Sequence, residues 1–439
     1  MANQGKHLNS VHVRHEKHTS GCVTEIMPIP ETVCISMSQH IGAPCKPLVA
    51  KGDTVKVGQP IGDVDAFVSA PIHSSVSGTV KEIGTVRSAM GGFDQAIIIE
   101  TDGKQEVWEG VEPPVINSRE DFIAAIRKSG LVGLGGASFP THIKLSPKNL
   151  DECDTLIVNA AECEPFITSD HRLMLENTDS ILDGIEAIMK YLELSKAHIG
   201  VEENKPDAIE ALNAEIKARG KADCIFVNVL RSTYPQGAER VMVYEITGKT
   251  LNAGELPAML GIILSNVTTI AFVGQHLKTG RPLTTKRLTV DGDAVARPTN
   301  IIVPIGARIA DVIAACGGYK AEPKKILMGG PMMGRAIFSD ELPVIKNNNA
   351  ILAFDEKQTL IPEETACIKC GMCTRACPFN LMPVVLSEAY ETKNVVKLQQ
   401  YKVMQCMECG SCAYVCPAKR PLGFNNKMGK GLVKEATSK

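Results

Sequence analysis

The 439-residue chain has few aromatic residues, little net charge and no uninterrupted hydrophobic run long enough to span a membrane. Aromatic side chains make up 4% of the sequence and include a single tryptophan. A formal net charge of −2 argues against the strongly basic surface of nucleic-acid-binding proteins. The most hydrophobic long stretch, from Leu256 to Gly274, is interrupted by four polar residues that disfavour insertion into lipid: Ser265, Asn266, Thr268 and Thr269.

The first 22 residues also lack the apolar segment of a secretory signal, so we expect a cytoplasmic protein. In that reducing compartment, cysteines are expected to bind metals or to pack in apolar cores, and not to form disulfides. The length of the chain predicts about two to four domains.

Two segments near the C-terminus carry the strongest signal in the sequence, CIKCGMCTRACP and CMECGSCAYVCP. Both have the spacing C-x2-C-x2-C-x3-C-P, which is typical of bacterial ferredoxins with two clusters. A cubane iron–sulfur cluster needs four thiolates, of which one loop supplies three and the other segment the fourth. We therefore predict one [4Fe-4S] cluster on Cys367, Cys370, Cys373 and Cys416, and a second on Cys406, Cys409, Cys412 and Cys377. Zinc knuckles use a similar C-x2-C spacing, but the doubled four-cysteine run favours iron–sulfur clusters.

The residues between the two motifs, 386–401, are predicted to form one helix, so residues 362–422 make a compact ferredoxin-like module. Two clusters indicate the transfer of single electrons. The other cysteines are expected mostly as small apolar core residues: Cys22, Cys34, Cys45, Cys153, Cys163, Cys224 and Cys316. The tract of His12, His15, His18 and Cys22 is either a metal site or an exposed tail.

The chain before Trp108 shows short apolar runs separated by glycine turns, a pattern that predicts closely spaced β-strands. Its segments GDTVKVGQPIG and APIHSSVSGTV resemble the barrel-sandwich hybrid of biotinyl and lipoyl carriers. Carriers of that kind need a lysine at the tip of a hairpin, and residues 59–78 contain none. We therefore expect a scaffold or docking domain.

From residue 117 the pattern alternates between helix and strand. A helix is predicted from its cap Ser118 to Gly130. Strands over 155–160, 197–201 and 224–230 alternate with helical stretches over 169–194, 206–220 and 237–248. This order predicts a mainly parallel sheet with helices on its faces, and ligands of such sheets lie beyond the carboxyl ends of the strands. Residues 286–318 read as strand, turn, strand and helix, and resemble a ligand-binding β-grasp domain.

The segment VGLGGASFPTHIKL, residues 132–145, combines Gly133, Gly135 and Gly136 with a basic side chain at Lys144. Clustered glycines allow backbone N–H groups to point at an anion, so the loop suits a phosphate. It matches neither the Walker loop nor the dinucleotide fingerprint. Polar residues directly after a buried strand, Asn159, Glu162 and Glu164, strengthen the interpretation as a binding site. The helices predicted later in the chain also begin with polar residues, and the N-terminus of a helix attracts phosphate groups.

The order of these modules, with the segments GLGGASFPTHIKL, NAAECEPFITSD, SQHIGAPCKPLV and TYPQGAER, resembles the C subunits of Rnf complexes over nearly the whole chain. The resemblance implies a multidomain α/β and α+β protein. Its parts would be an N-terminal barrel-sandwich hybrid over 1–110, a Rossmann-like α/β domain for FMN and NADH over 111–275, a β-grasp domain over 276–345 and a two-cluster [4Fe-4S] ferredoxin-like helical domain over 346–439.

The same resemblance implies a function. Rnf complexes are membrane-bound ferredoxin:NAD oxidoreductases that couple electron transfer to the export of sodium ions or protons. Such a C subunit would exchange hydride with NAD(H) at non-covalent FMN and relay single electrons through two [4Fe-4S] clusters. Expected partners are NAD(H), other subunits with iron–sulfur or flavin groups and, indirectly, ferredoxin. The expected location is the cytoplasmic side of the membrane, as a peripheral subunit.

The α/β part is also similar to the flavin subunit of respiratory complex I, whose FMN loop reads G-R-G-G-A-G-F-P where this chain has residues 133–140. Carried over by position, the similarity implies FMN contacts at Gly133, Gly135, Gly136, Lys144, Asn159, Glu164, Tyr234, Gly237, Glu239, Asn266 and Thr269. Lys144, Asn266 and Thr269 would meet the phosphate. Glu164 would act as the catalytic-site residue that shapes the approach of the nicotinamide.

This chain departs from that relative at three places. Leu134 replaces the loop arginine, and Ala161 replaces an aspartate beside the flavin. The relative stacks adenine between phenylalanines, whereas the corresponding KLSP and ELPA segments here contain no aromatic ring. Two alternatives stay open: a soluble flavin and iron–sulfur corrin reductase of cobalamin metabolism, which is a related family, or a non-catalytic iron–sulfur relay subunit, for which Leu134 and Ala161 are the support. A flavin between NAD(H) and the clusters fits the chemistry, because a flavin exchanges both hydride and single electrons.

Overall fold

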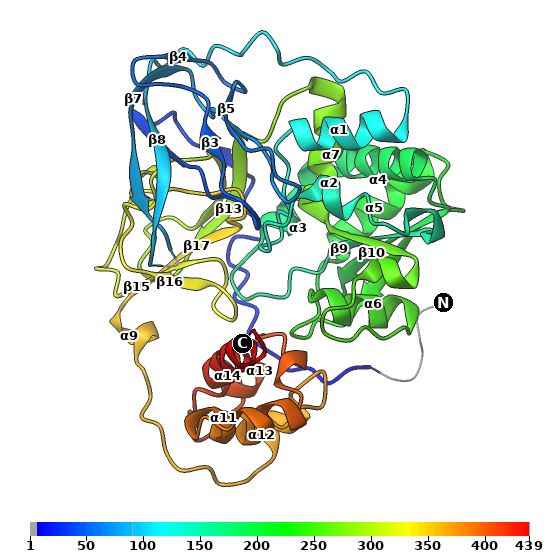
Figure 1. The fold of residues 1–439 in the computed structure, drawn as a ribbon, viewed down its shortest axis with the longest axis vertical. Coiled ribbons are helices and arrows are strands. Elements are labelled where there is room, and N and C mark those ends of the chain that lie inside the picture. Colours follow the sequence, from blue (N-terminus) through cyan, green and yellow to red (C-terminus); the bar gives the residue numbers. More distant parts are fainter. Residues whose placement is uncertain (1–6, 90, 439) are drawn as a thin grey trace.

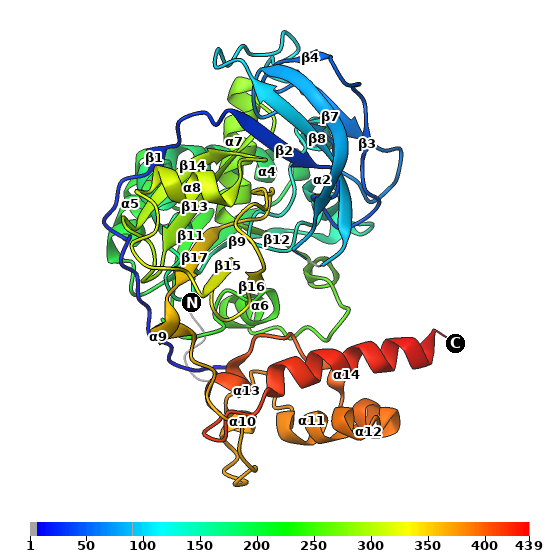
Figure 2. The same cartoon turned by 90° about the vertical axis from the view of Figure 1, so that its left-hand side faces the viewer.

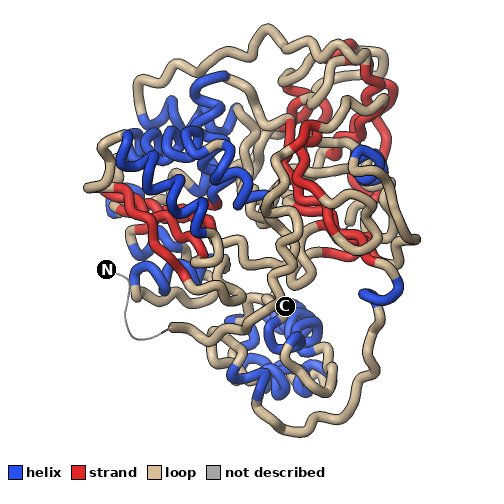
Figure 3. Tube along the Cα trace, turned by 180° about the vertical axis from the view of Figure 1, so that it is seen from behind, coloured by secondary structure: helices blue, strands red, loops and turns tan. Residues whose placement is uncertain are grey.

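The computed structural model describes residues 7–89 and 91–438 of the chain. A β-rich lobe, with strands from residues 25–101 and 285–354, stands beside an α/β lobe, and a small helical module lies at one end of both (Figure 1). Viewed from behind, the strands gather mainly in the first lobe and the helices in the other two parts (Figure 3). Among the described residues, the structure contains no helix with the length and hydropathy of a membrane span.

Two small antiparallel sheets enclose the N-terminal barrel core. The first has the order β2-β8-β7-β4, with β2 Thr32–Ser36, β4 Thr54–Val55, β7 Gly78–Arg87 and β8 Phe93–Thr101. The second has the order β3-β5-β6, with β3 Lys46–Pro47, β5 Pro60–Asp63 and β6 Ile72–His73. Alternate side chains of these strands face inward and pack together, among them Val33, Ile35, Ile61, Ile97 and Ile99.

The α/β lobe contains the predicted parallel sheet, which confirms that part of the fold. Its order is β11-β10-β9-β12, with β9 Thr155–Ala160, β10 Lys196–Glu202, β11 Ile225–Leu230 and β12 Ile262–Asn266. The surrounding helices are α1 Arg119–Lys128, α2 Thr141–Lys144, α3 Ser169–Glu176, α4 Thr178–Leu192, α5 Pro206–Ala218, α6 Glu239–Thr247 and α7 Val267–Thr279. Short 3-10 turns occupy Leu150–Glu152 and Pro257–Leu260. One face of the sheet packs on α4, α5 and α7, and the other packs on α6.

The continuous helix expected over 169–194 is divided in two at Asn177. This residue leaves the helical conformation, with φ −137° and ψ 38°. Its side-chain oxygen accepts a hydrogen bond from Arg287, 2.6 Å away, on a neighbouring strand. A tertiary contact with a residue distant in sequence therefore stabilises the break, which helical periodicity could not reveal.

A six-stranded sheet forms the β-grasp part, in the order β1-β14-β13-β17-β15-β16. The strands are β1 Glu25–Ile26, β13 Thr285–Asp291, β14 Thr299–Pro304, β15 Lys325–Met328, β16 Arg335–Ile337 and β17 Ala350–Phe354, with helix α8 Ile309–Ala315. Because β17 is fully buried and pairs with β13 and β15, this part continues beyond residue 345, where the sequence had suggested a boundary.

The C-terminal module is helical, with α10 Met372–Arg375, α11 Pro383–Glu391, α12 Val395–Gln400, α13 Ser411–Tyr414 and the long α14 Leu422–Thr437. A connecting segment with α9 Glu356–Thr359 leads to it from β17. The single helix predicted over 386–401 is wrong in detail, because the chain turns between α11 and α12. Lys393 has a left-handed φ of 51°, and the Asn394 side chain accepts a hydrogen bond from Lys397 N, which starts the next helix.

Residues 7–27, here called the N-terminal strap, lie outside the barrel. The strap runs from the helical module along the α/β lobe to the β-grasp sheet (Figure 2). Asn9 donates to the carbonyl oxygen of Cys377 over 3.1 Å, Val11 pairs with Tyr234, and β1 pairs with β14. The strap therefore links three parts that are distant in sequence. We predicted that the first 22 residues contain no secretory signal. Residues 1–6 of that segment lie outside the described residues.

Candidate functional site

The glycine loop closes on its own base and leaves its tip exposed. Gly133 N donates to the carbonyl oxygen of Phe139 over 2.8 Å, and Ser138 N donates back to that of Gly133 over 3.2 Å. At the tip, Gly135, Gly136 and Ala137 are exposed, and their amides donate to no protein atom of residues 7–89 or 91–438. Gly136 has φ +113°, a conformation open to glycine and strained for other residues. Free amides on a curved loop form an anion-binding nest.

Side chains from three other segments hold this loop in place. Leu134 N donates to the hydroxyl of Thr269 over 3.0 Å, and Lys286 Nζ donates to the carbonyl oxygen of Leu134 over 3.2 Å. Asn347 Nδ2 donates to the carbonyl oxygen of Gly136 over 3.0 Å. Thr269 is fully buried, so its hydroxyl supports the loop from inside. The sequence had assigned Thr269 to the phosphate itself; Lys286 and Asn347, from the β-grasp part, were not anticipated.

The position of Leu134 explains the departure from the complex I loop. Its side chain is 2% exposed and packs in the apolar core of the α/β lobe. A leucine there stabilises the domain, and the loop amides remain available without any side chain at this position. The absence of the arginine therefore leaves the anion nest in place.

Lys144, a few residues after the glycine loop, forms an ion pair with Glu239. Lys144 ends the short helix α2, and its Nζ lies 2.6 Å from Oε2 of Glu239 at the start of α6. Nearby, Asn159 at the end of β9 donates from Nδ2 to the carbonyl oxygen of Gly237 over 2.7 Å. A Cβ added at Gly237 would lie 2.5 Å from the carbonyl oxygen of Ala161. Four predicted residues, Lys144, Asn159, Gly237 and Glu239, thus converge at the carboxyl edge of the sheet.

The start of α3 completes this edge with a carboxylate network. Asp170 accepts hydrogen bonds from Asn266 Nδ2 over 2.8 Å and from the Thr268 hydroxyl over 2.5 Å. The Asp170 backbone donates to Glu162 over 2.7 Å, and burial raises the pKa of Glu162 to about 6. Gly135 sits against Asn266, because an added Cβ would lie 3.0 Å from the asparagine Cβ. The structure therefore brings Asn266 to the glycine loop, and its contact with the FMN phosphate stays a prediction.

Glu164 lies two residues after Glu162, in the loop between β9 and α3, and contacts the β-grasp part. Its two carboxylate oxygens accept hydrogen bonds from the backbone amides of Met332 and Met333, over 3.0 and 2.9 Å. Burial raises the pKa of Glu164 to about 7. These bonds give Glu164 a structural role at the junction of two domains, in addition to the nicotinamide contact expected from the sequence.

Lys17 of the N-terminal strap organises the loop that carries Glu162 and Glu164. Its Nζ donates to the carbonyl oxygens of Glu162 and Glu164, both over 2.8 Å, and of Ile167 over 2.5 Å. Burial lowers the pKa of Lys17. Nothing in the local sequence distinguishes Lys17 from other lysines, because its three acceptors lie about 150 residues away in the chain.

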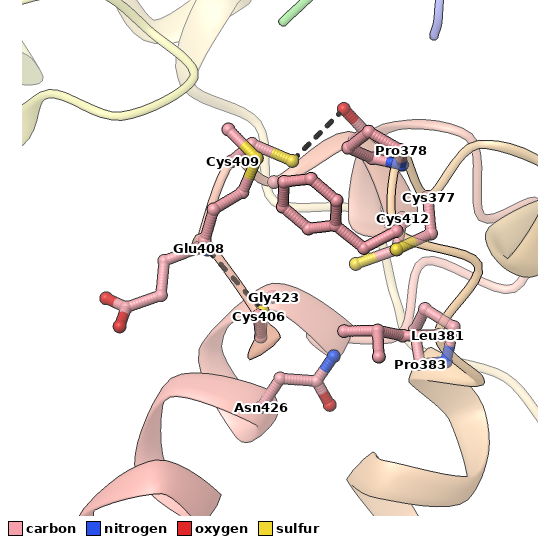
Figure 4. Close-up of a pocket in the computed structure, with 14 residues that line it drawn as sticks. Cys377, Pro378, Leu381, Pro383, Cys406, Glu408, Cys409, Cys412, Gly423 and Asn426 are labelled. Carbon is pink, nitrogen blue, oxygen red and sulfur yellow. Dashed lines mark hydrogen bonds between the residues drawn. The ribbon is translucent and has the colours of Figure 1, made fainter. Parts of the chain in front are cut away.

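Four cysteines line one pocket of the helical module: Cys377, Cys406, Cys409 and Cys412. Figure 4 shows the side chains of Cys377 and Cys412 turned toward each other in this pocket, with Cys406 and Cys409 on its other sides. Three come from the second motif and one from the first, which is the crossed set predicted for the second cluster. We call this set the inner cysteines. Four thiols that surround a space, one for each iron, suit a cubane cluster.

The other predicted set, Cys367, Cys370, Cys373 and Cys416, is less enclosed and is called the outer cysteines. Cys416 is buried in a group of apolar side chains, and Cys373 packs against the same group. Cys370, in contrast, is exposed. Apolar side chains are also exposed here: Ile361, before the motif, is 87% exposed, and Ile368, between Cys367 and Cys370, is 68% exposed. The outer set therefore reaches the surface of the protein at Cys370.

Tyr234 joins the inner cysteines to the α/β lobe. Its ring is 1% exposed and packs with Val11, Val13, Ala376 and Cys409. Its hydroxyl donates to the carbonyl oxygen of Cys409 over 2.7 Å. The sequence placed Tyr234 beside the flavin, which stays a prediction; the structure shows its contact with the loop of Cys409.

The histidine tract of the strap does not converge. His18 pairs with Asp291 and Glu16, while Cys22 lies next to the carbonyl oxygen of Pro298. Over residues 7–89 and 91–438, no three histidine, cysteine or acidic side chains meet at a point suited to a single metal ion. The tract therefore acts as part of the strap in this structure.

Comparison with known families divides the chain into four matches. Residues 6–104 match the RnfC barrel-sandwich hybrid domain, 126–275 the Nuo51 FMN-binding domain, 287–336 the SLBB domain and 359–417 the 4Fe-4S dicluster domain. The matches confirm the predicted fold class and the order of its parts. They also support FMN and iron–sulfur clusters as cofactors.

Two relatives are similar over most of their length. The C subunit of the proton-translocating ferredoxin:NAD(+) oxidoreductase complex of Clostridium ljungdahlii is 44% identical over 376 residues, which cover 85% of this chain and 81% of that protein. Its counterpart from the Na(+)-translocating complex of Acetobacterium woodii is 42% identical, and the match covers 83% of this chain and 82% of that protein. An NAD+-reducing [NiFe]-hydrogenase, in its H2-reduced state, has a similar fold, with TM-score 0.51 and 17% identity over 73% of this chain and 61% of that chain.

Proposed function

Because the chain belongs to the family of C subunits of ion-translocating ferredoxin:NAD(+) oxidoreductase complexes, we propose that it connects NAD(H) to a chain of one-electron carriers. Two-electron hydride chemistry would take place at FMN in the α/β lobe, and two [4Fe-4S] clusters would carry single electrons away or deliver them. The domain matches for FMN and for a 4Fe-4S dicluster support both parts of this proposal. The corrin reductase alternative finds no support among these relatives.

The observation that carries the proposal is the exposed glycine nest in the loop that leads to Lys144. The free amides at Gly135, Gly136 and Ala137 would hold the FMN phosphate, with Lys144 as a counter-charge. Asn159 and Glu164 would lie beside the flavin ring, and Tyr234, Gly237 and Glu239 along it. Bound FMN supplies the ability to exchange hydride with NAD(H) and single electrons with a cluster.

The contacts of Tyr234 support an order for the two clusters. The inner cysteines lie against the α/β lobe through the Tyr234 to Cys409 hydrogen bond, whereas the outer cysteines reach the surface at Cys370. The inner cluster would therefore exchange electrons with the flavin, and the outer cluster with another subunit. The exposed Ile361 and Ile368 would belong to the contact surface for that subunit.

The same family membership makes other subunits of a membrane complex the partners of this chain. We place it on the cytoplasmic side of the membrane as a peripheral subunit. NAD(H) would reach it directly there, and ferredoxin would act through a partner.

Anaerobic isolation of the full chain tests the function. We expect about one FMN and about eight iron atoms per chain, the content of one flavin site and two cubanes. We also expect NADH oxidation with ferricyanide as electron acceptor. If the chain holds iron at this level but neither binds FMN nor oxidises NADH, it is a non-catalytic relay subunit.

A further inference from the structure

Arg240, the second residue of α6, connects the α/β lobe to the helical module. It follows Glu239, whose carboxylate pairs with Lys144. The guanidinium of Arg240 reaches Gln405, the residue directly before Cys406. Its Nη1 donates to the carbonyl oxygen of Gln405 over 3.1 Å, and its Nη2 donates to the side-chain oxygen over 2.8 Å. Two consecutive residues of one helix therefore contact the predicted flavin site and a cluster-binding loop.

The guanidinium of Arg240 also covers the ring of Phe379, two residues after Cys377. The distance from Arg240 Cζ to the centroid of this ring is 3.7 Å, a cation–π contact. Phe379 lines the same pocket as the inner cysteines. Arg240 therefore contacts a close neighbour of one inner ligand in each motif, Cys377 and Cys406, and holds its charge beside the pocket.

Neutral oxygens accept the hydrogen bonds of Arg240 in the part of the chain that the structure describes. They are the carbonyl oxygens of Leu251 and Gln405 and the side-chain oxygen of Gln405. Burial lowers the pKa of Arg240, and the charges of Glu255 and Cys377 act in the opposite direction. Glu255 is exposed, so solvent screens its charge. An arginine stays protonated in such surroundings, and the positive charge therefore persists beside the pocket.

A second cation at the pocket is balanced by a carboxylate. Lys430 of α14 donates from Nζ to the carbonyl oxygen of Cys406 over 2.9 Å. The same Nζ lies 2.6 Å from Oε1 of Glu408. This pair adds little net charge, whereas Arg240 brings an unbalanced positive charge to the side of the pocket that faces the α/β lobe.

We propose that Arg240 raises the midpoint potential of the inner cluster and so makes it a better acceptor of electrons from the α/β lobe. The net charge around an iron–sulfur cluster is one of the factors that set its potential. Each electron that enters the cluster adds one negative charge, which a nearby cation stabilises. The inference rests on the proposed function, since it assumes a [4Fe-4S] cluster on the inner cysteines. It gives Arg240 an electrostatic part in electron transfer, besides its part in docking the helical module.

The test is a redox titration of the anaerobically isolated full chain, followed by electron paramagnetic resonance. The Cys377→Ala variant identifies the signal of the inner cluster. Arg240→Met removes the charge and keeps a long side chain. At a fixed solution potential we expect the ratio of reduced to oxidised inner cluster to fall roughly 10-fold, a shift of about 59 mV to more negative potential for a one-electron couple. The potential of the outer cluster should shift less.

Three further variants separate the charge of Arg240 from its structural contacts. Arg240→Lys retains the charge and should keep the inner potential near that of wild type. Gln405→Ala removes one acceptor of the guanidinium but leaves the charge, so it controls for a loosened contact. Arg281→Met removes an exposed arginine directly after α7 and controls for the loss of one positive charge in the α/β lobe.

An unchanged inner potential in Arg240→Met would overturn the inference, as would an equal shift in Gln405→Ala. If Arg240→Met does not retain the inner cluster, Arg240→Gln, which keeps a donor for Gln405, gives the same measurement. Loss of the inner cluster in both variants would also overturn the inference, because Arg240 would then serve assembly alone. A wild-type chain without the inner cluster would count against the proposed function instead.

Discussion

The hydroxyl of Tyr234 donates a hydrogen bond to the carbonyl oxygen of Cys409, 2.7 Å away, and so connects the α/β lobe with a cluster-binding loop. Both residues are buried, and the strap residue Val11 packs against them. Two parts that would exchange electrons in the proposed function are thereby held in contact.

Tyr234→Phe should loosen this contact without changing the shape of the core. The variant leaves the Cys409 carbonyl without its partner, a loss of about 1–2 kcal/mol of stability for a buried group. We expect NADH to reduce the flavin at the normal rate and the clusters more slowly, as measured by rapid mixing under anaerobic conditions. Tyr401→Phe, at a partly buried tyrosine of the helical module, serves as the control. Equal rates of cluster reduction in variant and wild type would contradict a coupling role for Tyr234.

Cys377→Ala should damage the cluster held by the second motif. Cys377 belongs to the first motif in sequence but lines the pocket of Cys406, Cys409 and Cys412. The paramagnetic resonance signal of the inner cluster should therefore be lost or altered, while that of the outer cluster remains. Cys416→Ala should have the opposite effect. Loss of the outer signal in Cys377→Ala would refute the crossed ligation.

Lys144→Ala should weaken flavin binding. A charged donor to a phosphate contributes about 1.5–3 kcal/mol, so we expect the dissociation constant of FMN to rise roughly 10- to 100-fold. Iron content should stay unchanged, because Lys144 lies in the α/β lobe. Lys148→Ala removes an exposed lysine four residues away and should leave flavin affinity as it is. Unchanged affinity in Lys144→Ala would place the phosphate elsewhere.

Patterns within one segment were sufficient for much of this fold and site. The alternation of strands and helices predicted the parallel sheet, and the two cysteine motifs predicted the inner set that the structure brings into one pocket. The glycine spacing predicted an exposed nest. Each of these features depends on residues close together in sequence or on a repeated spacing.

Contacts between distant segments could not be predicted in this way. Lys17, Lys286 and Asn347 support the loops of the site from the strap and the β-grasp part, and none belongs to a recognisable motif. The break between α3 and α4 depends on Arg287, which lies more than 100 residues away. Tertiary hydrogen bonds decide such details, and a single sequence does not reveal them.

Glu164→Gln should change how stability depends on pH. Burial raises the pKa of Glu164 to about 7 in the folded protein, whereas a glutamate in the unfolded chain has a pKa of about 4.3. Between these values the folded state holds a proton that the unfolded state releases, so this group lowers the free energy of unfolding as pH rises from about 4.3 to 7. Glutamine does not titrate. The thermal midpoint of the variant minus that of wild type should therefore increase from pH 5 to pH 8. For Glu363→Gln, at an exposed position, this difference should not change with pH.

Lys17→Met should disturb the flavin site from outside the α/β lobe. Methionine keeps the length of the side chain but donates no hydrogen bond, so the carbonyl oxygens of Glu162, Glu164 and Ile167 would lose a shared partner. The loop after β9 would then no longer be fixed, and a buried positive charge near the flavin would be removed.

The loss of that charge should make the flavin harder to reduce, because an electron-rich flavin is stabilised by nearby cations. We therefore expect a lower flavin midpoint potential and weaker FMN binding in Lys17→Met, with both clusters intact by resonance spectroscopy. Lys17→Arg retains the charge and donors and should preserve the potential better than methionine does. Lys51→Met, at an exposed position of the barrel, controls for the loss of a lysine in general. A Lys17→Met protein with normal flavin affinity and potential would show that the strap only fastens the domains together.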